Sequence, residues 1–183
     1  ELIPFPSLEP EVSHIVENWD PNATVIDLGA GLGQYSIFFA RKGMKVIACD
    51  LSLERLKRLR NYLSVHFPEL SIHLVVAKAE NLPFLDTSVD YIFTHSVLIH
   101  TDLSGSLPEI SRVFRLEAGF AEPTVFNPIV NLYRKTLAPK EWQGMTRYFD
   151  ESVFQEILRC FPKPHFSVIF RKRHFLSFLA YVF

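Results

Sequence analysis

The chain of 183 residues is 48% hydrophobic, and a chain of this length buries about 70% of its unfolded surface, which predicts a single globular domain. Its formal net charge of −1 offers no general electrostatic attraction for nucleic acid or an anionic membrane. Two cysteines and the absence of a ~18-residue apolar run exclude a disulfide framework and a membrane span, and predict a cytoplasmic protein.

The first predicted elements are a helix and a strand. Ser7 is placed to cap a helix whose apolar residues recur at helical spacing up to Trp19, before Asp20-Pro21-Asn22 interrupts the pattern. An apolar, β-branched run from Thr24 to Leu28 then predicts a buried strand.

Three glycines follow this strand, at positions 29, 31 and 33, before a helical pattern that begins at Gln34. Glycines permit positive φ and let a ligand approach the backbone amides, while the N-terminus of a helix attracts electron-rich atoms. We therefore expect a nucleotide-type ligand here. The spacing is G-x-G-x-G, with Gln34 in the last glycine position of the dinucleotide fingerprint, which disfavours a pyrophosphate and an NAD-dependent oxidoreductase.

The next strand, Lys45 to Asp50, ends in an acidic residue roughly twenty positions after the glycines, where folds of this kind hold ribose hydroxyls. Ser52 is placed to cap a helix with leucines on one face and basic residues, including Arg55 and Arg60, on the other. A solvated helix face accounts for these charges, with a nucleic-acid stripe as the alternative.

Two later segments complete a recognisable order of motifs. The strand Ile72 to Val76 leads to Ala79-Glu80-Asn81-Leu82-Pro83-Phe84, and the strand from Ser88 to His95 leads to Leu98-Ile99-His100. With Asp27, the glycine turn and Asp50, this order resembles the class I S-adenosylmethionine (SAM) dependent methyltransferases, in particular the small-molecule members of the ubiquinone/menaquinone-biosynthesis type.

The resemblance implies a fold, a cofactor and a set of site residues. The implied fold is α/β, a doubly wound, Rossmann-like, mostly parallel sheet with helices on both faces and a C-terminal antiparallel hairpin over 165–171 and 174–183. The implied cofactor is SAM, and the implied partner is a small-molecule acceptor that is methylated on an O, N or C atom. The implied cofactor-binding residues are Asp27, Gly29, Ala30, Gly31, Asp50, Leu51, Ala79, Glu80, Thr94 and His95.

Methyl transfer requires few catalytic side chains, because holding the acceptor in line with the methyl group accounts for much of the rate acceleration. His95, at the end of a strand, is the expected general base, and His100 is the alternative. The chain has no carboxylate and histidine cluster with the spacing of metal ligands, so we expect no metal site.

Two departures from the family pattern keep a catalytically inactive, SAM-binding partner subunit open as an alternative. Lys78 occupies the position of an aspartate and cannot accept a hydrogen bond from adenine, so adenine recognition would use backbone groups near Ala79. The capping box Ser106 to Glu109 predicts a helix that ends near Leu116, which leaves only a short fifth strand.

The segment 123–149 is broken by three prolines and rich in aromatic and basic residues, so it is either a lid over the acceptor site or apolar packing against the sheet. Asp150 is placed to cap the last helix, with Phe149 packing on Phe154. We predict one domain over 1–183, and the sequence does not specify its oligomeric state.

Overall fold

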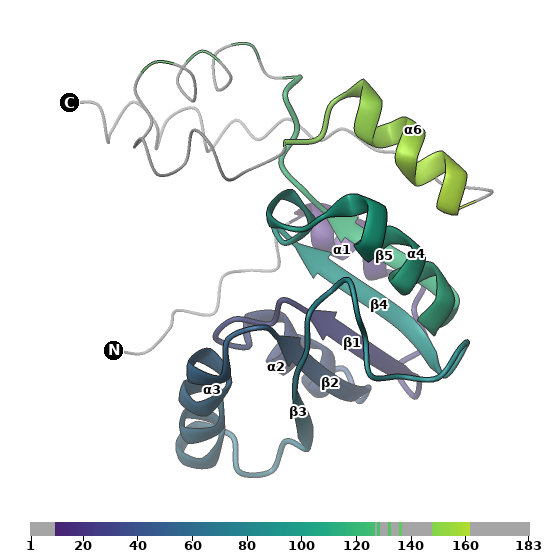
Figure 1. The fold of residues 1–183 in the computed structure, drawn as a ribbon. Coiled ribbons are helices and arrows are strands. Elements are labelled where there is room, and N and C mark those ends of the chain that lie inside the picture. The colour runs from purple at the N-terminus through teal and green to yellow at the C-terminus, as the bar shows by residue number, and fades with distance from the viewer. Residues whose placement is uncertain (1–9, 127, 129–131, 133–135, 137–147, 162–183) are drawn as a thin grey trace.

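The computed structural model describes residues 10–126, 128, 132, 136 and 148–161, and the statements below concern these residues. Five strands form one sheet in the order β3-β2-β1-β4-β5, and every pairing in it is parallel (Figure 1). The strands are β1 (Thr24–Leu28), β2 (Lys45–Asp50), β3 (Ile72–Val76), β4 (Val89–His95) and β5 (Phe114–Ala121). The doubly wound α/β fold predicted from the sequence is confirmed, with the strand order reversing at β1 between β2 and β4.

Helices cover both faces of the sheet, as expected for parallel strands joined by crossover connections. They are α1 (Pro10–Val16), α2 (Gln34–Arg41), α3 (Leu53–His66), the short 3₁₀ helix η1 (Leu98–His100), α4 (Leu103–Val113) and α6 (Glu151–Cys160). The hydrophobic core places α1, α2 and α3 on one face and α4 and α6 on the other. The carboxyl ends of β1 and β4, where the strand order reverses, therefore lie between these two helical layers.

An aromatic cluster packs α2 and the segment after α1 against the sheet. Trp19 stacks on Tyr91 of β4, with ring centroids 4.4 Å apart and an angle of 6° between the planes. The same indole packs on Phe39 of α2 and against the edge of Phe93. Buried aromatic residues contribute large apolar areas. This cluster therefore holds the helical layer in register with the central strands.

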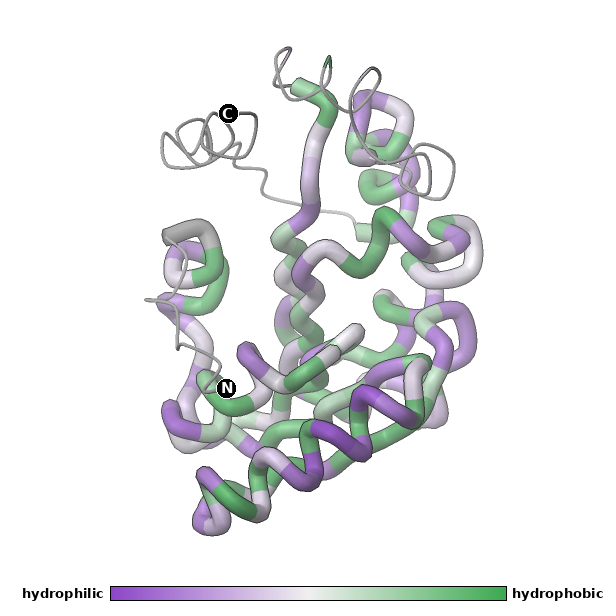
Figure 2. The backbone as a smooth tube through the Cα atoms, turned by 90° about the vertical axis from the view of Figure 1, so that its left-hand side faces the viewer, coloured by the Kyte–Doolittle hydropathy of each residue, from purple (hydrophilic) through white to green (hydrophobic). Residues whose placement is uncertain are grey.

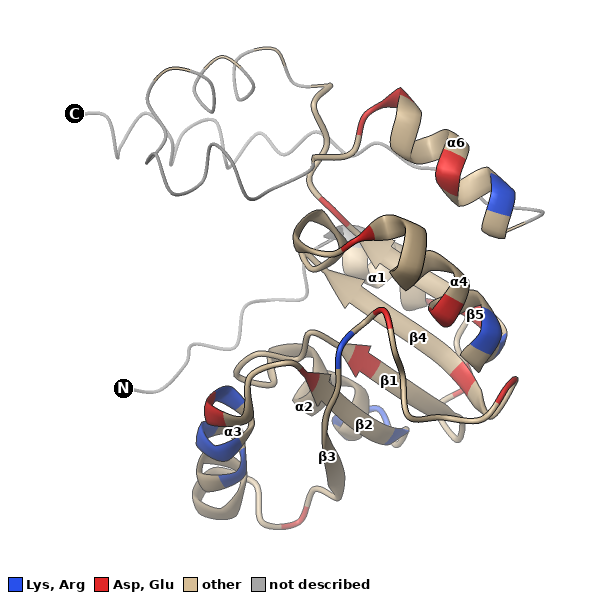
Figure 3. Cartoon of the chain, in the orientation of Figure 1, with Lys and Arg blue, Asp and Glu red and all other residues tan. Residues whose placement is uncertain are grey.

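Helix α3 has the amphipathic pattern that the sequence predicts. Ser52 Oγ accepts a hydrogen bond from the Arg55 amide at 3.3 Å, which confirms the predicted N-cap. Hydrophilic and hydrophobic residues are interspersed along this helix (Figure 2), and its lysines and arginines, marked in Figure 3, are exposed. The leucines Leu56 and Leu59 are buried while Arg60 is exposed. The basic run therefore occupies a solvated helix face.

The prediction of a short fifth strand is wrong. Helix α4 begins at Leu103 and not at Ser106, because Asp102 caps it by accepting a hydrogen bond from the Ser104 amide at 3.1 Å. The helix ends at Val113, and β5 starts at the next residue and continues for 8 residues. A bulge in the pairing of β4 with β5 accommodates this abrupt change from helix to strand.

The last described helix begins as predicted. Asp150 Oδ1 accepts a hydrogen bond from the Val153 amide at 3.1 Å, and the rings of Phe149 and Phe154 pack edge to face with centroids 6.3 Å apart. The predicted hairpin over 165–171 and 174–183 lies outside the described residues, as does most of the segment 123–149. Within the part of the chain that is described, no helix combines the length and apolar composition needed to cross a membrane.

The close contact between α1 and β5 yields a stability prediction. A Cβ atom at Gly119 would overlap Ile15 and press on the Trp19 ring, so we expect Gly119→Ala to lower the free energy of unfolding by ~1–3 kcal/mol through overpacking. Urea unfolding of the parent and the variant measures this change. Glu117→Ala, an exposed change on the same strand, is the control.

A second substitution tests the cause. Ile15→Ala makes room for the added methyl group, so the double variant should lose less stability than the sum of the two single changes. Simple additivity would mean that the contact with Ile15 is not the source of the cost.

Candidate functional site

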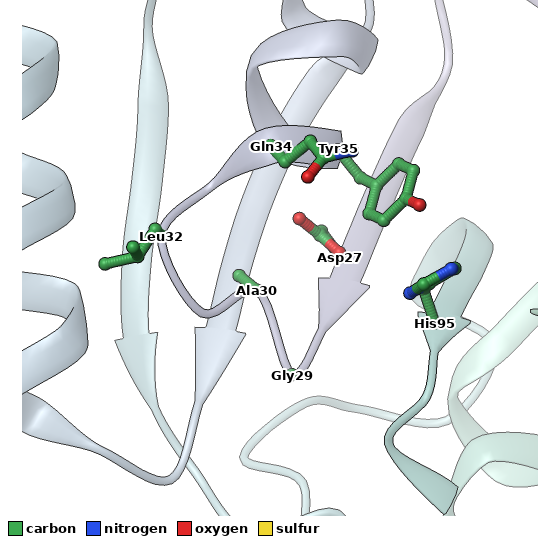
Figure 4. A pocket seen from close by; sticks show the side chains of 7 residues that line it. All are labelled: Asp27, Gly29, Ala30, Leu32, Gln34, Tyr35 and His95. Atoms are coloured by element: carbon green, nitrogen blue, oxygen red, sulfur yellow. The ribbon is translucent and has the colours of Figure 1, made fainter. Parts of the chain in front are cut away.

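A cavity of about 230 Å³ opens at the carboxyl end of β1, beside the end of β4. It is lined by Asp27, Gly29, Ala30, Leu32, Gln34, Tyr35 and His95 (Figure 4). Ligand pockets usually measure ~300–1,000 Å³, so this cavity has room for part of a nucleotide-sized molecule. Its position at the reversal of strand order is where doubly wound folds bind ligands.

The glycine turn is attached to β2 at one end. The amides of Gly29 and Ala30 both donate to the carbonyl oxygen of Cys49, at 2.7 and 3.0 Å. The Cys49 side chain is fully buried, and this burial raises the pKa of its thiol to about 12. Cys49 thus contributes its backbone to the turn, while its thiol stays protonated and chemically inert.

The glycines of the turn have different reasons to be glycine. At Gly29 a Cβ atom would overlap the Val97 side chain, which lies against this face of the turn. At Gly31 a Cβ atom would meet no heavy atom closer than the Gly29 carbonyl oxygen, at 3.9 Å. Gly31 has φ of 56°, which only glycine adopts readily. The backbone at Gly31 is therefore open to close approach by a ligand.

Asp50 stabilises the same turn from the end of β2. Its Oδ2 accepts a hydrogen bond from the Gly31 amide and its Oδ1 accepts one from the Ser52 amide, both at 2.8 Å. Only 5% of Asp50 is exposed. An ionised carboxylate has about four acceptor positions, so Asp50 retains capacity for further donors such as ribose hydroxyls.

Asp27 is the most strongly buried acid of the site, with 2% of its surface exposed. Ser36 Oγ donates a hydrogen bond to Asp27 Oδ2 at 2.5 Å. Burial raises the pKa of Asp27 to about 6; the hydrogen bonds from Ser36 oppose this rise, and the nearby charge of Asp50 adds to it. A cationic ligand group beside Asp27 would favour the ionised form.

The ring of Tyr35 lies between Asp27 and His95 at the cavity (Figure 4). Its centroid is 4.9 Å from that of His95 and 5.0 Å from that of Phe93. His95 is partly buried and lines the cavity, whereas His100 is exposed on η1 and does not. The structure thus separates the two histidines that the sequence offered as candidate bases.

Several residues implied by the family resemblance lie outside the cavity lining. Leu51 is 69% exposed beside Asp50, and Ala79 is buried in the core. Glu80 Oε1 accepts a hydrogen bond from the Asp102 amide at 2.9 Å, so this carboxylate holds the start of α4. Lys78 Nζ lies 3.9 Å from Glu80 Oε2, and the Lys78 side chain is largely exposed.

Thr94 makes its side-chain contact with a residue that sequence reasoning missed. It is fully buried, and its hydroxyl donates to Glu122 Oε1 at 2.9 Å. Glu122 directly follows β5, and its Oε2 is buried without a hydrogen-bond partner among the described residues. Burial raises the pKa of Glu122, and hydrogen bonds to the carboxylate, from the Val97 and Leu98 amides foremost, oppose this rise.

Two sequence signals could have found the missed residues. Glu122 directly follows β5, much as Asp50 ends β2, but the expected short fifth strand concealed this signal. Tyr35 stands in the first turn of the helix after the glycines, where a side chain can face the end of β4.

Comparison with known proteins agrees with this geometry. Residues 26–120 match the family model described as a methyltransferase domain. The chain is 36% identical over 118 residues to a ubiquinone/menaquinone biosynthesis C-methyltransferase of Hahella chejuensis, covering 60% of this chain and 47% of that protein. It is 34% identical over 92 residues to a malonyl-[acyl-carrier protein] O-methyltransferase of Hamiltonella defensa, covering 50% of this chain and 33% of that protein. The chain thus spans between a third and a half of the length of these two relatives.

The fold also matches solved structures. A SAM-dependent methyltransferase from Methanosarcina mazei superposes with a TM-score of 0.64 at 21% identity, over 85% of this chain and 83% of that one. At this level of identity the likeness supports the fold.

The raised pKa of Asp27 predicts a pH dependence of stability. The pKa of this acid is about 3.9 when unfolded, so its contribution is most favourable below pH 4 and is lost as the pH rises through 6. Asp27→Asn removes this titration. Its stability relative to the parent should therefore be ~1–1.5 kcal/mol more favourable at pH 7.5 than at pH 5.

Urea unfolding of the parent and Asp27→Asn at the two pH values measures the difference. Asp86→Asn, at an exposed position, controls for changes in overall charge. An equal stability difference between Asp27→Asn and the parent at both pH values would contradict the raised pKa.

Proposed function

The chain belongs to the methyltransferase-domain family, and from this premise we propose that it transfers a methyl group from SAM to an O, N or C atom of a small molecule. The observation that carries the proposal is the glycine turn, with its open face at Gly31 and carboxylates at the ends of the two strands beside it. A single domain over 1–183 and a cytoplasmic location are proposed with it, on the sequence alone.

The residues present fit SAM in three respects. The open face of the turn at Gly31 leaves space for a ligand to contact the protein backbone closely. Asp50 lies at the end of β2 with unused acceptor capacity, which suits the two hydroxyls of a ribose. The cavity beside Asp27 is bordered by a carboxylate and two aromatic rings, which suits the cationic methionine part.

When bound, SAM supplies a methyl group activated by a positively charged sulfur. The chain has to bind it, orient the acceptor and exclude water, because methyl transfer needs an in-line approach of the acceptor atom. We propose that Asp27, Gly29, Ala30, Gly31, Asp50 and His95 bind the cofactor, together with Leu51 and backbone groups near Ala79. For Glu80 and Thr94 we propose contacts through their backbones, because their side chains bind other parts of the protein.

His95 is our candidate general base for an acceptor that must lose a proton. It ends β4, lines the cavity and packs beside Tyr35. Imidazole accepts and releases protons near neutral pH, which suits this role. The exposed position of His100 makes it the weaker candidate.

An experiment with ligands separates this proposal from its alternatives. Calorimetric titration should detect binding of SAM and of its demethylated product, S-adenosylhomocysteine (SAH), and no binding of NAD. Transfer of a labelled methyl group from SAM into small molecules of a cell extract would distinguish an enzyme from an inactive, SAM-binding partner subunit. Tight NAD binding without SAM binding would overturn the proposal.

The role of Asp50 gives a specific prediction. Hydrogen bonds to a charged group contribute ~1.5–3 kcal/mol, so Asp50→Asn should weaken SAM binding at least tenfold. The variant also loses one backbone acceptor in the turn, so its Tm should fall and the Kd must be measured well below it. Glu54→Gln, on the exposed face of α3, should leave the Kd unchanged. An unaltered Kd in Asp50→Asn would refute the ribose assignment.

The role of His95 is tested by comparing turnover with binding. If His95 is the base, His95→Asn should lower kcat for labelled methyl transfer by ~10²–10⁴-fold while the Kd for SAH stays within a few-fold. His100→Asn tests the alternative base and should retain activity, while His14→Asn, at an exposed position of α1, is the control. A loss of SAH binding in His95→Asn that accounts for the whole loss of activity would leave this residue a cofactor contact only and refute its role as the base.

A further inference from the structure

Glu122 joins the ends of two strands, β5 and β4, at the candidate site. It follows β5, and its Oε1 accepts hydrogen bonds from Thr94 Oγ1 of β4 and from the amides of Val97 and Leu98, at 2.9, 3.0 and 3.1 Å. The donors come from the end of β4 and from the turn that follows it. One carboxylate oxygen therefore fixes both the strand and the start of η1.

The turn that Glu122 holds has little intrinsic preference for its conformation. Ser96 has φ of 56°, an unfavourable value for a residue with a side chain. Its amide donates to the Ala121 carbonyl oxygen at 3.0 Å, so β5 holds the turn through its backbone as well. Backbone strain of this kind persists only where surrounding contacts determine the conformation.

The turn after β4 contacts the glycine turn through the Val97 side chain. The Val97 side chain occupies the space that a Cβ atom would fill at Gly29. Gly29 also donates to Cys49, so the glycine turn lies between Val97 on one side and β2 on the other. A path of direct contacts thus leads from Glu122 through Val97 to Gly29.

We propose that Glu122 is a positioning residue of the cofactor site, which holds Val97 against Gly29 and so sets the shape of the glycine turn. It acts through hydrogen-bond acceptance by one oxygen, because the second oxygen has no partner in the described structure. The proposal deepens the proposed function and rests on it for the binding measurement only.

The chemistry of the site makes a conservative variant informative. Glutamine has the size of glutamate and can present its carbonyl oxygen to the three donors, with the amide nitrogen in the position of Oε2. Alanine leaves the hydroxyl of Thr94 and the two amides without their acceptor, which is costly for buried groups. Positioning by hydrogen-bond acceptance therefore predicts rescue by glutamine and not by alanine.

The experiment compares Glu122→Ala, Glu122→Gln and the control Glu117→Ala, an exposed position of β5. Hydrogen exchange of the Val97 and Leu98 amides, followed by NMR without ligand, should be at least tenfold faster than in the parent only in Glu122→Ala. The Kd for SAH, measured well below the Tm, should rise at least tenfold in the same variant. Glu122→Gln should stay within threefold of the parent in both measurements.

Val97→Ala gives a second, independent measurement if Glu122→Ala fails to fold. It keeps the backbone hydrogen bonds to Glu122 and removes the contact with Gly29, so it should also raise the Kd for SAH at least fivefold. A Kd within twofold of the parent would overturn the proposed path.

Three further outcomes would contradict the role of Glu122 or the proposed function. Unchanged exchange or an unchanged Kd in Glu122→Ala would overturn the positioning role, and a Glu122→Gln variant as impaired as Glu122→Ala would show that charge is what matters. Failure of the parent to bind SAM or SAH would refute the proposed function, while the exchange measurement would still test Glu122.

Discussion

The close contact between Gly29 and Val97 is the constraint on which the candidate site depends. It brings the turn after β1 against the turn after β4, so the two strands at the reversal point end in one shared surface. Any side chain at position 29 would push these turns apart. The cavity beside Asp27 is lined from both sides of this contact, by Gly29 and Ala30 of the glycine turn and by His95 at the end of β4.

Patterns that depend on neighbouring residues were predictable from the sequence. Apolar β-branched runs predicted the first four strands, because branched side chains favour an extended, buried backbone. Short polar residues at helix starts predicted the caps Ser52 and Asp150, because each cap bonds an amide only three residues away. The start of α4 was not predictable in the same way. Asp102 and Ser106 are both good caps, and the choice of Asp102 follows from the packing of the helix against the sheet and from Glu80, which binds the Asp102 amide.

The part of the candidate site that lies at the carboxyl ends of neighbouring strands was predictable from the sequence. Asp27 and His95 both reach the cavity because the carboxyl ends of neighbouring parallel strands meet. The partners of Glu80 and Thr94 were not predictable, because the residues that they bind are distant in sequence and a local pattern does not specify them. The contacts of Glu122 were equally unpredictable, since they involve amides that are 24 and 25 residues away.

The buried thiol of Cys49 allows opening of the sheet to be measured chemically. Cys49 lies on β2, where its side chain is fully covered, while Cys160, the only other cysteine of the chain, is partly exposed on α6. A thiol-reactive reagent therefore modifies Cys160 in the native protein but reaches Cys49 only when β2 separates from its cover. The rate of modification at Cys49 reports how often the centre of the sheet opens. A ligand that binds at the glycine turn of the closed protein alone lowers the population of the open form, and the rate of Cys49 modification falls in proportion.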